Sequence, residues 1–132
     1  MRDEIKPLPI DVVAAVLKHE NKFLIAKRNS SQSFPLKWEF PGGKVEKGES
    51  FEKALIREIN EELTVEIKVL EKIGLKLVND KMLNISVHYF YGKICSGVIK
   101  LKEHTDFKWV KKNDFKSYDF IIGDKEILPL IL

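Results

Sequence analysis

Three glutamates, Glu58, Glu61 and Glu62, stand at spacings that an α-helix would place on one face. Carboxylates gathered in this way repel one another, and a divalent cation relieves that repulsion. Their hard oxygen atoms are the ligands that Mg²⁺ prefers, with room left for water and phosphate oxygens. Arg57, beside them, can pair with one carboxylate and fix its orientation. Acidic faces are also common on solvated helices, so the spacing alone leaves both interpretations open.

The residues that precede this cluster favour the chemical interpretation. Pro41-Gly42-Gly43-Lys44 and then Gly48-Glu49 form a loop whose glycines let the backbone approach a ligand closely. A glycine loop that leads into a helix can bring phosphate groups and a divalent cation together. The sequence therefore predicts a joint site for phosphates and a metal.

The elements that must position these residues follow from the apolar pattern. A helix is expected from Ser50, as its N-cap, to about Leu63. A second helix is expected near the C-terminus, although Pro129 disturbs its last turn. Strands are expected at residues 11–17, 22–27, 65–70, 74–78, 83–94 and 108–110, with 38–40 extended, a turn at 79–80 and the second helix at 124–130. This order predicts one mixed α/β domain over residues 1–132.

Composition limits the class of protein. The chain has 132 residues, 44% of them apolar and 33% charged, as in an ordinary globular domain. There is no apolar run of the roughly 20 residues that cross a bilayer, and the N-terminus does not resemble a signal peptide. The lone Cys95, expected in the core, forms no internal disulfide, so we expect a cytoplasmic protein. The net charge of +3 comes from scattered lysines and does not indicate binding to a nucleic acid polymer.

The segment that contains the glutamates resembles the Nudix box, G-x5-E-x7-R-E-U-x-E-E-x-G-U, in which U is a bulky apolar residue. The positions that match are Gly43, Glu49, Arg57, Glu58, Ile59, Glu61, Glu62 and Val65. One position departs, because Thr64 stands where the family has glycine. A residue at that place often needs a positive φ, which costs a β-branched side chain about 1 kcal/mol. The departure concerns the exit of the helix and not the metal ligands.

Residues outside the box resemble the MutT-type nucleoside triphosphate pyrophosphohydrolases of this family. The run from Trp38 to Lys44 is similar to their entry to the box, and Arg28 matches a position that reaches the nucleotide. Glu103 resembles a loop carboxylate that serves as a further metal ligand or base. The segment ending at Asp124 is similar to the one that contacts the base edge. The resemblance implies an α/β/α sandwich with a mixed β-sheet between helices.

The family resemblance also implies roles for individual residues. Mg²⁺, with Mn²⁺ as a substitute, would be bound by the box glutamates, Glu103 and the Gly43 carbonyl, and Glu61 or Glu103 would be the general base. Arg57 would orient these carboxylates. The residues expected to contact the nucleotide are Arg28 and Lys44 for the triphosphate, Glu39 and Asp124 for the base edge, and Phe40 or an aromatic of residues 88–90 for its face.

The expected reaction splits a nucleoside triphosphate, such as 8-oxo-dGTP or a cytosine nucleotide, into a monophosphate and pyrophosphate. Two alternatives stay open. The substrate could be another nucleoside diphosphate-linked compound, such as a nucleotide sugar or dinucleoside polyphosphate, or the domain could bind nucleotides without catalysis. A catalytically inactive domain usually lacks a box carboxylate, and here all are present. The chain is expected to act as a monomer or homodimer, without nucleic acid or membrane partners.

Overall fold

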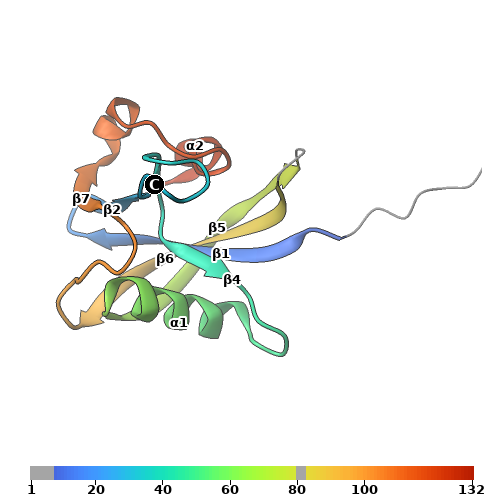
Figure 1. Ribbon diagram of the computed structural model, residues 1–132. Coiled ribbons are helices and arrows are strands. Elements are labelled where there is room, and N and C mark those ends of the chain that lie inside the picture. The colour runs from blue at the N-terminus through green and yellow to red at the C-terminus, as the bar shows by residue number, and fades with distance from the viewer. Residues whose placement is uncertain (1–7, 80–82) are drawn as a thin grey trace, which may run out of the picture.

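A computed structural model, which describes residues 8–79 and 83–132, has a mixed β-sheet with helices on both faces (Figure 1). The strands are β1 (Ile10–His19), β2 (Lys22–Lys27), β3 (Trp38–Glu39), β4 (Gly42–Lys44), β5 (Glu66–Asn79), β6 (Asn84–Ser96) and β7 (Asp106–Lys111). The helical segments are α1 (Phe51–Leu63), α2 (Asp124–Ile127) and two 3₁₀ turns, η1 (Lys112–Ser117) and η2 (Leu128–Leu130). The predicted α/β sandwich with a mixed sheet is confirmed.

Strand β1 lies at the centre of the sheet, in the order β3-β2-β1-β6-β5, while β4 pairs with β1 and β7 with β2. It runs parallel to β6 and antiparallel to β4, so that Val13 stands between His88 and Gly43. A Cβ atom at Gly42 would collide with the backbone of Val13, so the close pairing of β4 requires glycine there. The glycine loop is thus fixed to the middle of the sheet.

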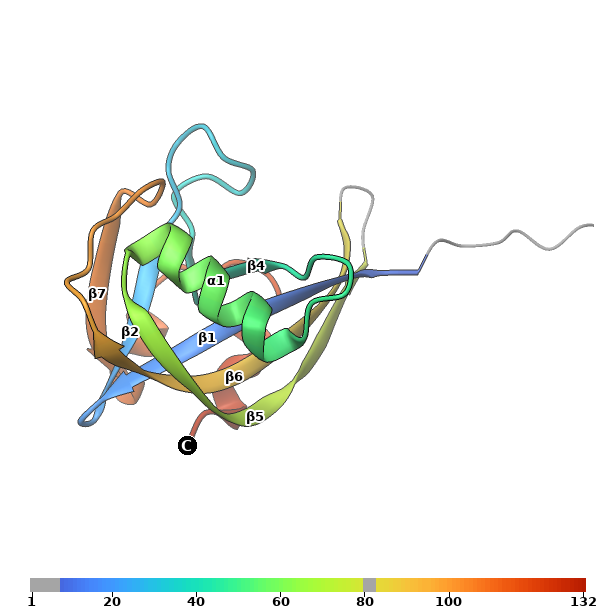
Figure 2. The ribbon, with the colours of Figure 1, turned by 90° about the horizontal axis from the view of Figure 1, so that it is seen from below.

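The continuous apolar run of β1 is buried on both faces of the sheet. Val13, Ala15 and Leu17 contribute to the core beneath α1, whereas Ala14 and Val16 contribute to the core beneath α2. Figure 2 shows α1 lying across β1, β5 and β6. This arrangement explains why the run has no polar alternation.

Helix α1 has the predicted boundaries. Its N-cap Ser50 accepts a hydrogen bond from the backbone N–H of Lys53 at 3.1 Å. Thr64 ends the helix in the left-handed conformation, with φ of 62°. Its hydroxyl donates to the carbonyl oxygens of Leu63 and Val98, at 2.6 and 3.0 Å. The helix therefore ends as the family pattern requires, although glycine is absent.

Several strand predictions were wrong in detail. The two strands predicted at 65–70 and 74–78 form one strand, β5, because register shifts after Val69 and Lys72 let it follow β6 throughout. Strand β4 was not predicted, because its three residues owe their conformation to pairing with β1. The predicted helix at 124–130 divides into α2 and η2, which contains Pro129.

Two further expectations concern single positions. Cys95 was expected in the core, but it lies near the end of β6 and is exposed. The turn predicted at 79–80 lies partly outside the described residues. Across residues 8–79 and 83–132, we find no helix with the length and apolar character needed to cross a membrane.

Candidate active site

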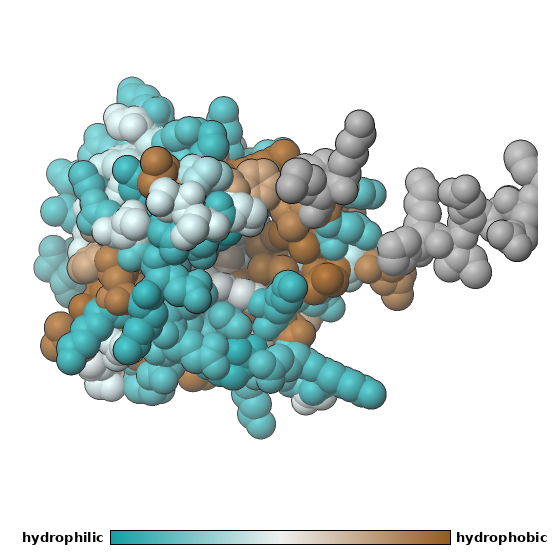
Figure 3. Space-filling view, viewed as in Figure 1, coloured by the Kyte–Doolittle hydropathy of each residue, from teal (hydrophilic) through white to brown (hydrophobic). Residues whose placement is uncertain are grey.

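A cleft of about 290 Å³ collects most of the predicted site residues. One wall, the helix wall, is the acidic face of α1, which reaches the cleft at Glu62. The opposite wall is built from β3, α2 and the loops after β2 and before β7, and strands β1, β4 and β6 also contribute to the lining. In Figure 3 the face shown is hollowed near its centre, above the hydrophilic surface of α1. The predicted residues that line the cleft are Arg28, Glu39, Phe40, Gly43, Glu62, Glu103 and Asp124. Residues separated widely along the chain thus meet at one place.

Hydrogen bonds from Arg57 hold α1 against the loop that precedes it. Its Nε and Nη2 atoms donate to the two carboxylate oxygens of Glu49 at 2.8 and 2.9 Å, and Nη1 donates to Glu58 at 2.8 Å. Nη2 also reaches the Lys44 carbonyl oxygen at 3.0 Å. These hydrogen bonds lower the pKa of Glu49 to about 2 and raise that of Arg57. The predicted pairing of Arg57 with a box carboxylate is confirmed.

The three glutamates of the helix face differ in their surroundings. Glu58 lies against Gly43, where an added Cβ would collide with its carboxylate. Glu61 is 58% exposed and contacts Arg57 at 3.3 Å. Glu62 is 18% exposed and lines the cleft. In the described part of the chain, no three His, Cys, Asp or Glu side chains already converge as a set of metal ligands.

Glu62 is held among like charges inside the cleft. Its burial raises its pKa to about 9, and the carboxylates of Glu39, Glu58 and Glu103 contribute in the same direction. The donors gathered here are all hard oxygen atoms, and the missing Cβ of Gly43 leaves room for the carboxylate of Glu58 beside the backbone. These features fit a divalent cation of the magnesium type.

On the opposite wall, the carboxylate of Glu39 is hydrogen bonded by two side chains, Arg28 and His104. Arg28 donates to both of its oxygens at 3.0 and 3.2 Å, and His104 Nε2 lies 2.8 Å from Oε2. Arg28 also donates from Nε to the Ser33 carbonyl oxygen at 2.8 Å. Arg28 lines the cleft, and its expected contact with a triphosphate stays a prediction.

Asp124 is buried at the inner end of the cleft. Its oxygens accept hydrogen bonds from the backbone N–H of Phe40 at 2.8 Å and from the Tyr89 hydroxyl at 2.5 Å. Burial raises the pKa of Asp124 to about 7, although the hydrogen bond from Tyr89 acts to lower it. Burial also raises the pKa of the Tyr89 hydroxyl well above its usual value. Asp124, in α2, is therefore joined to β6 and to the segment between β3 and β4.

The aromatic side chains considered for stacking are largely packed in the core. Phe40 is only 3% exposed, and its ring contacts Phe120 and Phe115, with centroids 5.5 and 6.1 Å away. Tyr89 is fully buried. Lys44 is exposed outside the residues that line the cleft. The proposed contacts of Phe40 and Lys44 with a nucleotide remain predictions.

Sequence reasoning missed His104 and the residues that hold Glu103. His104 is buried between Glu39 and the helix, one residue after the predicted Glu103. The loop after β2 supports this segment, because Asn29 Nδ2 donates to the Glu103 carbonyl oxygen at 2.9 Å and Gln32 Nε2 approaches its carboxylate at 3.4 Å. The only available signal was proximity to Glu103, which does not reveal a side-chain contact across the fold.

Comparison with known proteins identifies relatives of this arrangement. The model of the NUDIX domain family matches residues 7–131. The CTP pyrophosphohydrolase of Escherichia coli (strain K12) is 32% identical over 93% of this chain and 91% of that protein. The 8-oxo-dGTP diphosphatase of Buchnera aphidicola is 30% identical over 89% of each chain. A crystal structure of a MutT NUDIX hydrolase from Burkholderia pseudomallei has a TM-score of 0.86 at 21% identity, covering 96% of this chain and all 100% of that one.

Proposed function

The chain belongs to the NUDIX domain family, and we propose that it is a Mg²⁺-dependent nucleoside triphosphate pyrophosphohydrolase. It would release a nucleoside monophosphate and pyrophosphate. One observation carries this proposal: Glu62 and Glu103, suited to a metal, line the same cleft as Glu39 and Asp124, which can hydrogen bond to a base. A nucleotide placed there can meet both sets of groups at once.

The preferred base is proposed from the relatives and from Asp124. One relative is named a CTP pyrophosphohydrolase and another an 8-oxo-dGTP diphosphatase, so both substrates are candidates. The pKa of Asp124, about 7, allows its carboxyl group to donate as well as accept near neutral pH. We therefore place cytosine triphosphates first and 8-oxo-dGTP second among the substrates to test.

NUDIX hydrolases generally need a divalent metal, and Mg²⁺ is the metal proposed here. Glu58, Glu61 and Glu62 would hold it, with Glu103 and the Gly43 carbonyl as further candidates. When bound, such a cation neutralises phosphate charge and increases the acidity of a water molecule. The exposed side chain of Glu61 must turn to take part.

The residues of the chain itself would prepare the substrate for attack. Arg57 fixes the position of Glu58 and keeps the glycine loop against α1. Glu61 or Glu103 would accept the proton of the attacking water, since both carboxylates are exposed and Glu103 lines the cleft. Arg28 and Glu39 form a rigid pair that offers polar atoms to the base or sugar.

Identification of the products tests this proposal. The protein is incubated with Mg²⁺ and CTP, dCTP, UTP, dGTP, 8-oxo-dGTP, a nucleotide sugar and a dinucleoside polyphosphate. The proposal predicts monophosphate and pyrophosphate in equal amounts from a triphosphate, and no turnover with a chelator. Preferred cleavage of the nucleotide sugar or the dinucleoside polyphosphate would assign another substrate. Binding without any turnover would identify a catalytically inactive domain.

A further inference from the structure

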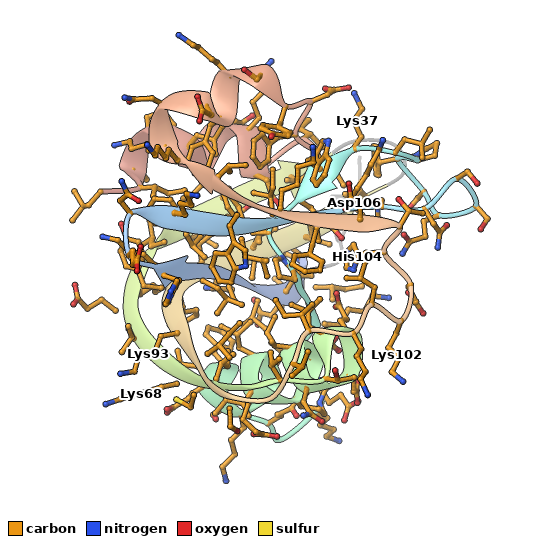
Figure 4. The ribbon with its side chains drawn as sticks, turned by 90° about the vertical axis from the view of Figure 1, so that its left-hand side faces the viewer. Lys37, Lys68, Lys93, Lys102, His104 and Asp106 are labelled. Atoms are coloured by element: carbon orange, nitrogen blue, oxygen red, sulfur yellow. The ribbon has the colours of Figure 1, made fainter. Side chains whose placement is uncertain are left out.

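His104 is a buried, polar side chain at the junction of the two walls of the cleft. Its side chain is only 2% exposed, and it comes from the loop before β7. Figure 4 shows it on this loop, with Asp106 above it at the start of β7 and Lys102 below it toward α1. Both ring nitrogens face acidic groups. Nothing in the helix motif requires a histidine at this place.

The contact with Glu39 assigns the proton on one ring nitrogen. Nε2 lies 2.8 Å from Oε2 of Glu39, whose other partner is the guanidinium of Arg28. An ionised carboxylate accepts hydrogen bonds but does not donate them, so Nε2 must carry the proton. Glu39 is thereby held by donors from two loops, and its carboxylate cannot rotate freely within the cleft.

The second ring nitrogen has no partner. Among the buried side-chain atoms of the described residues, His104 Nδ1 is the one without a hydrogen bond, and it lies 3.7 Å from Oε2 of Glu62. Buried polar atoms are almost always paired, and exceptions call for a functional explanation. With the proton on Nε2, Nδ1 carries a lone pair and cannot donate to an ionised Glu62, so the hydrogen bond to Glu39 is the contact that defines the role of His104.

From these contacts we propose that His104 is a positioning residue, which orients Glu39 through Nε2 for selection of the base. This inference rests on the proposed function, since it concerns base selection at the same cleft. His104 touches no reacting atom and acts only through Glu39.

Two near-isosteric substitutions test this role. His104→Gln places an amide N–H near the position of Nε2 but leaves nothing at Nδ1, whereas His104→Asn retains a polar atom near Nδ1 and cannot reach Glu39. His104→Phe keeps the ring and removes both contacts. His19→Gln is the matched control, because His19 is an exposed histidine in β1, 76% accessible and away from the cleft.

The turnover experiment compares kcat/KM for CTP against UTP and for 8-oxo-dGTP against dGTP. His104→Asn and His104→Phe should reduce the preference ratio about 10- to 100-fold, while His104→Gln should keep it within about threefold. His19→Gln should match the wild type in both ratios. A melting curve for each variant establishes that it is folded.

Binding without metal gives a second readout. Dissociation constants for CMP, UMP, 8-oxo-dGMP and dGMP are measured in a chelator, where the base contacts remain. The inference predicts that His104→Asn loses the preference between paired monophosphates and His104→Gln retains it. Unchanged ratios in all three variants, or equal loss in the Gln and Asn variants, would overturn it. Absence of turnover in the wild type would instead refute the proposed function, while these binding ratios would still test His104.

Discussion

The two walls of the cleft are built in different ways. The helix wall consists of residues close together in sequence, organised by one arginine that pairs with Glu49 and Glu58. The opposite wall is joined by contacts over long sequence separations, 65 residues between Glu39 and His104 and 84 between Phe40 and Asp124. Its polar groups form hydrogen bonds with one another across the fold, whereas Glu49 and Glu58 at the helix wall share Arg57 as their partner.

This difference indicates a division of work within the site. The helix wall concentrates carboxylates whose mutual repulsion a cation can offset, so it suits chemistry common to every nucleoside triphosphate. The opposite wall holds Glu39 and Asp124 in fixed orientations, which suits discrimination between bases. Changes to the first wall should affect all substrates alike, and changes to the second should affect their ratio.

The largest effect is expected at Glu62. Glu62→Gln should lower kcat/KM about 10³-fold for every nucleotide, because it removes a charged ligand worth several kcal/mol in the transition state. The fold should persist, since the replacement removes a buried carboxylate whose pKa is raised. Steady-state kinetics and melting curves measure both effects. Glu52→Gln, in the exposed first turn of α1, is the control and should behave like the wild type.

The next largest effect is a decrease in the stability of the fold with rising pH, which we expect Asp124 in the opposite wall to cause. Burial raises the pKa of Asp124 from 3.8 to about 7, so ionisation costs the folded state more than the unfolded state. The contribution of Asp124 to the free energy of unfolding is therefore greatest below pH 4 and is lost as the pH rises to about 7. Between pH 5 and 8 this loss should be about 2 to 3 kcal/mol.

Urea unfolding of wild type and Asp124→Asn at several pH values isolates this contribution. Asp124→Asn should lack the part of the decrease in the free energy of unfolding that comes from Asp124. Glu126→Gln, at an exposed position of α2, should show the same decrease as the wild type. Glu62 also has a raised pKa and adds a decrease of the same sign in all three proteins. Parallel profiles for wild type and Asp124→Asn would show that Asp124 is not the source.

The smallest effect tests the end of the helix wall. Thr64 has a φ of 62°, which glycine adopts more easily than a residue with a Cβ. Thr64→Gly should be about 1 kcal/mol more stable than Thr64→Ala, because both lose the hydroxyl contacts and only alanine keeps the strain. Denaturant melts provide the comparison. Equal stability of the two variants would mean that the left-handed conformation carries no cost here.

The helix wall could be predicted because its information is local. The spacing of Glu58, Glu61 and Glu62, the cap at Ser50 and the apolar stripe all follow from helix geometry. The pairing of Arg57 with a nearby carboxylate follows from the same spacing. The positive φ at Thr64 also followed from its place in the family pattern.

The opposite wall was predicted only as a set of residues, without its contacts. Nothing local shows that Asp124 meets Tyr89 or that His104 lies against Glu39, because those contacts depend on how β3, β6 and the loop before β7 pack. Strand β4 was missed for a similar reason. Its glycines have low strand propensity, and its pairing with β1 determines its conformation.

One kinetic comparison tests the division of work most directly. The kcat/KM values for CTP and UTP, and for 8-oxo-dGTP and dGTP, are measured in wild type, Arg57→Lys and Glu39→Gln. Arg57→Lys should lower all values about 10- to 100-fold and leave each ratio unchanged, since lysine cannot replace the forked contacts. Glu39→Gln should change at least one ratio about tenfold or more. A ratio that shifts as much in Arg57→Lys as in Glu39→Gln would contradict the account.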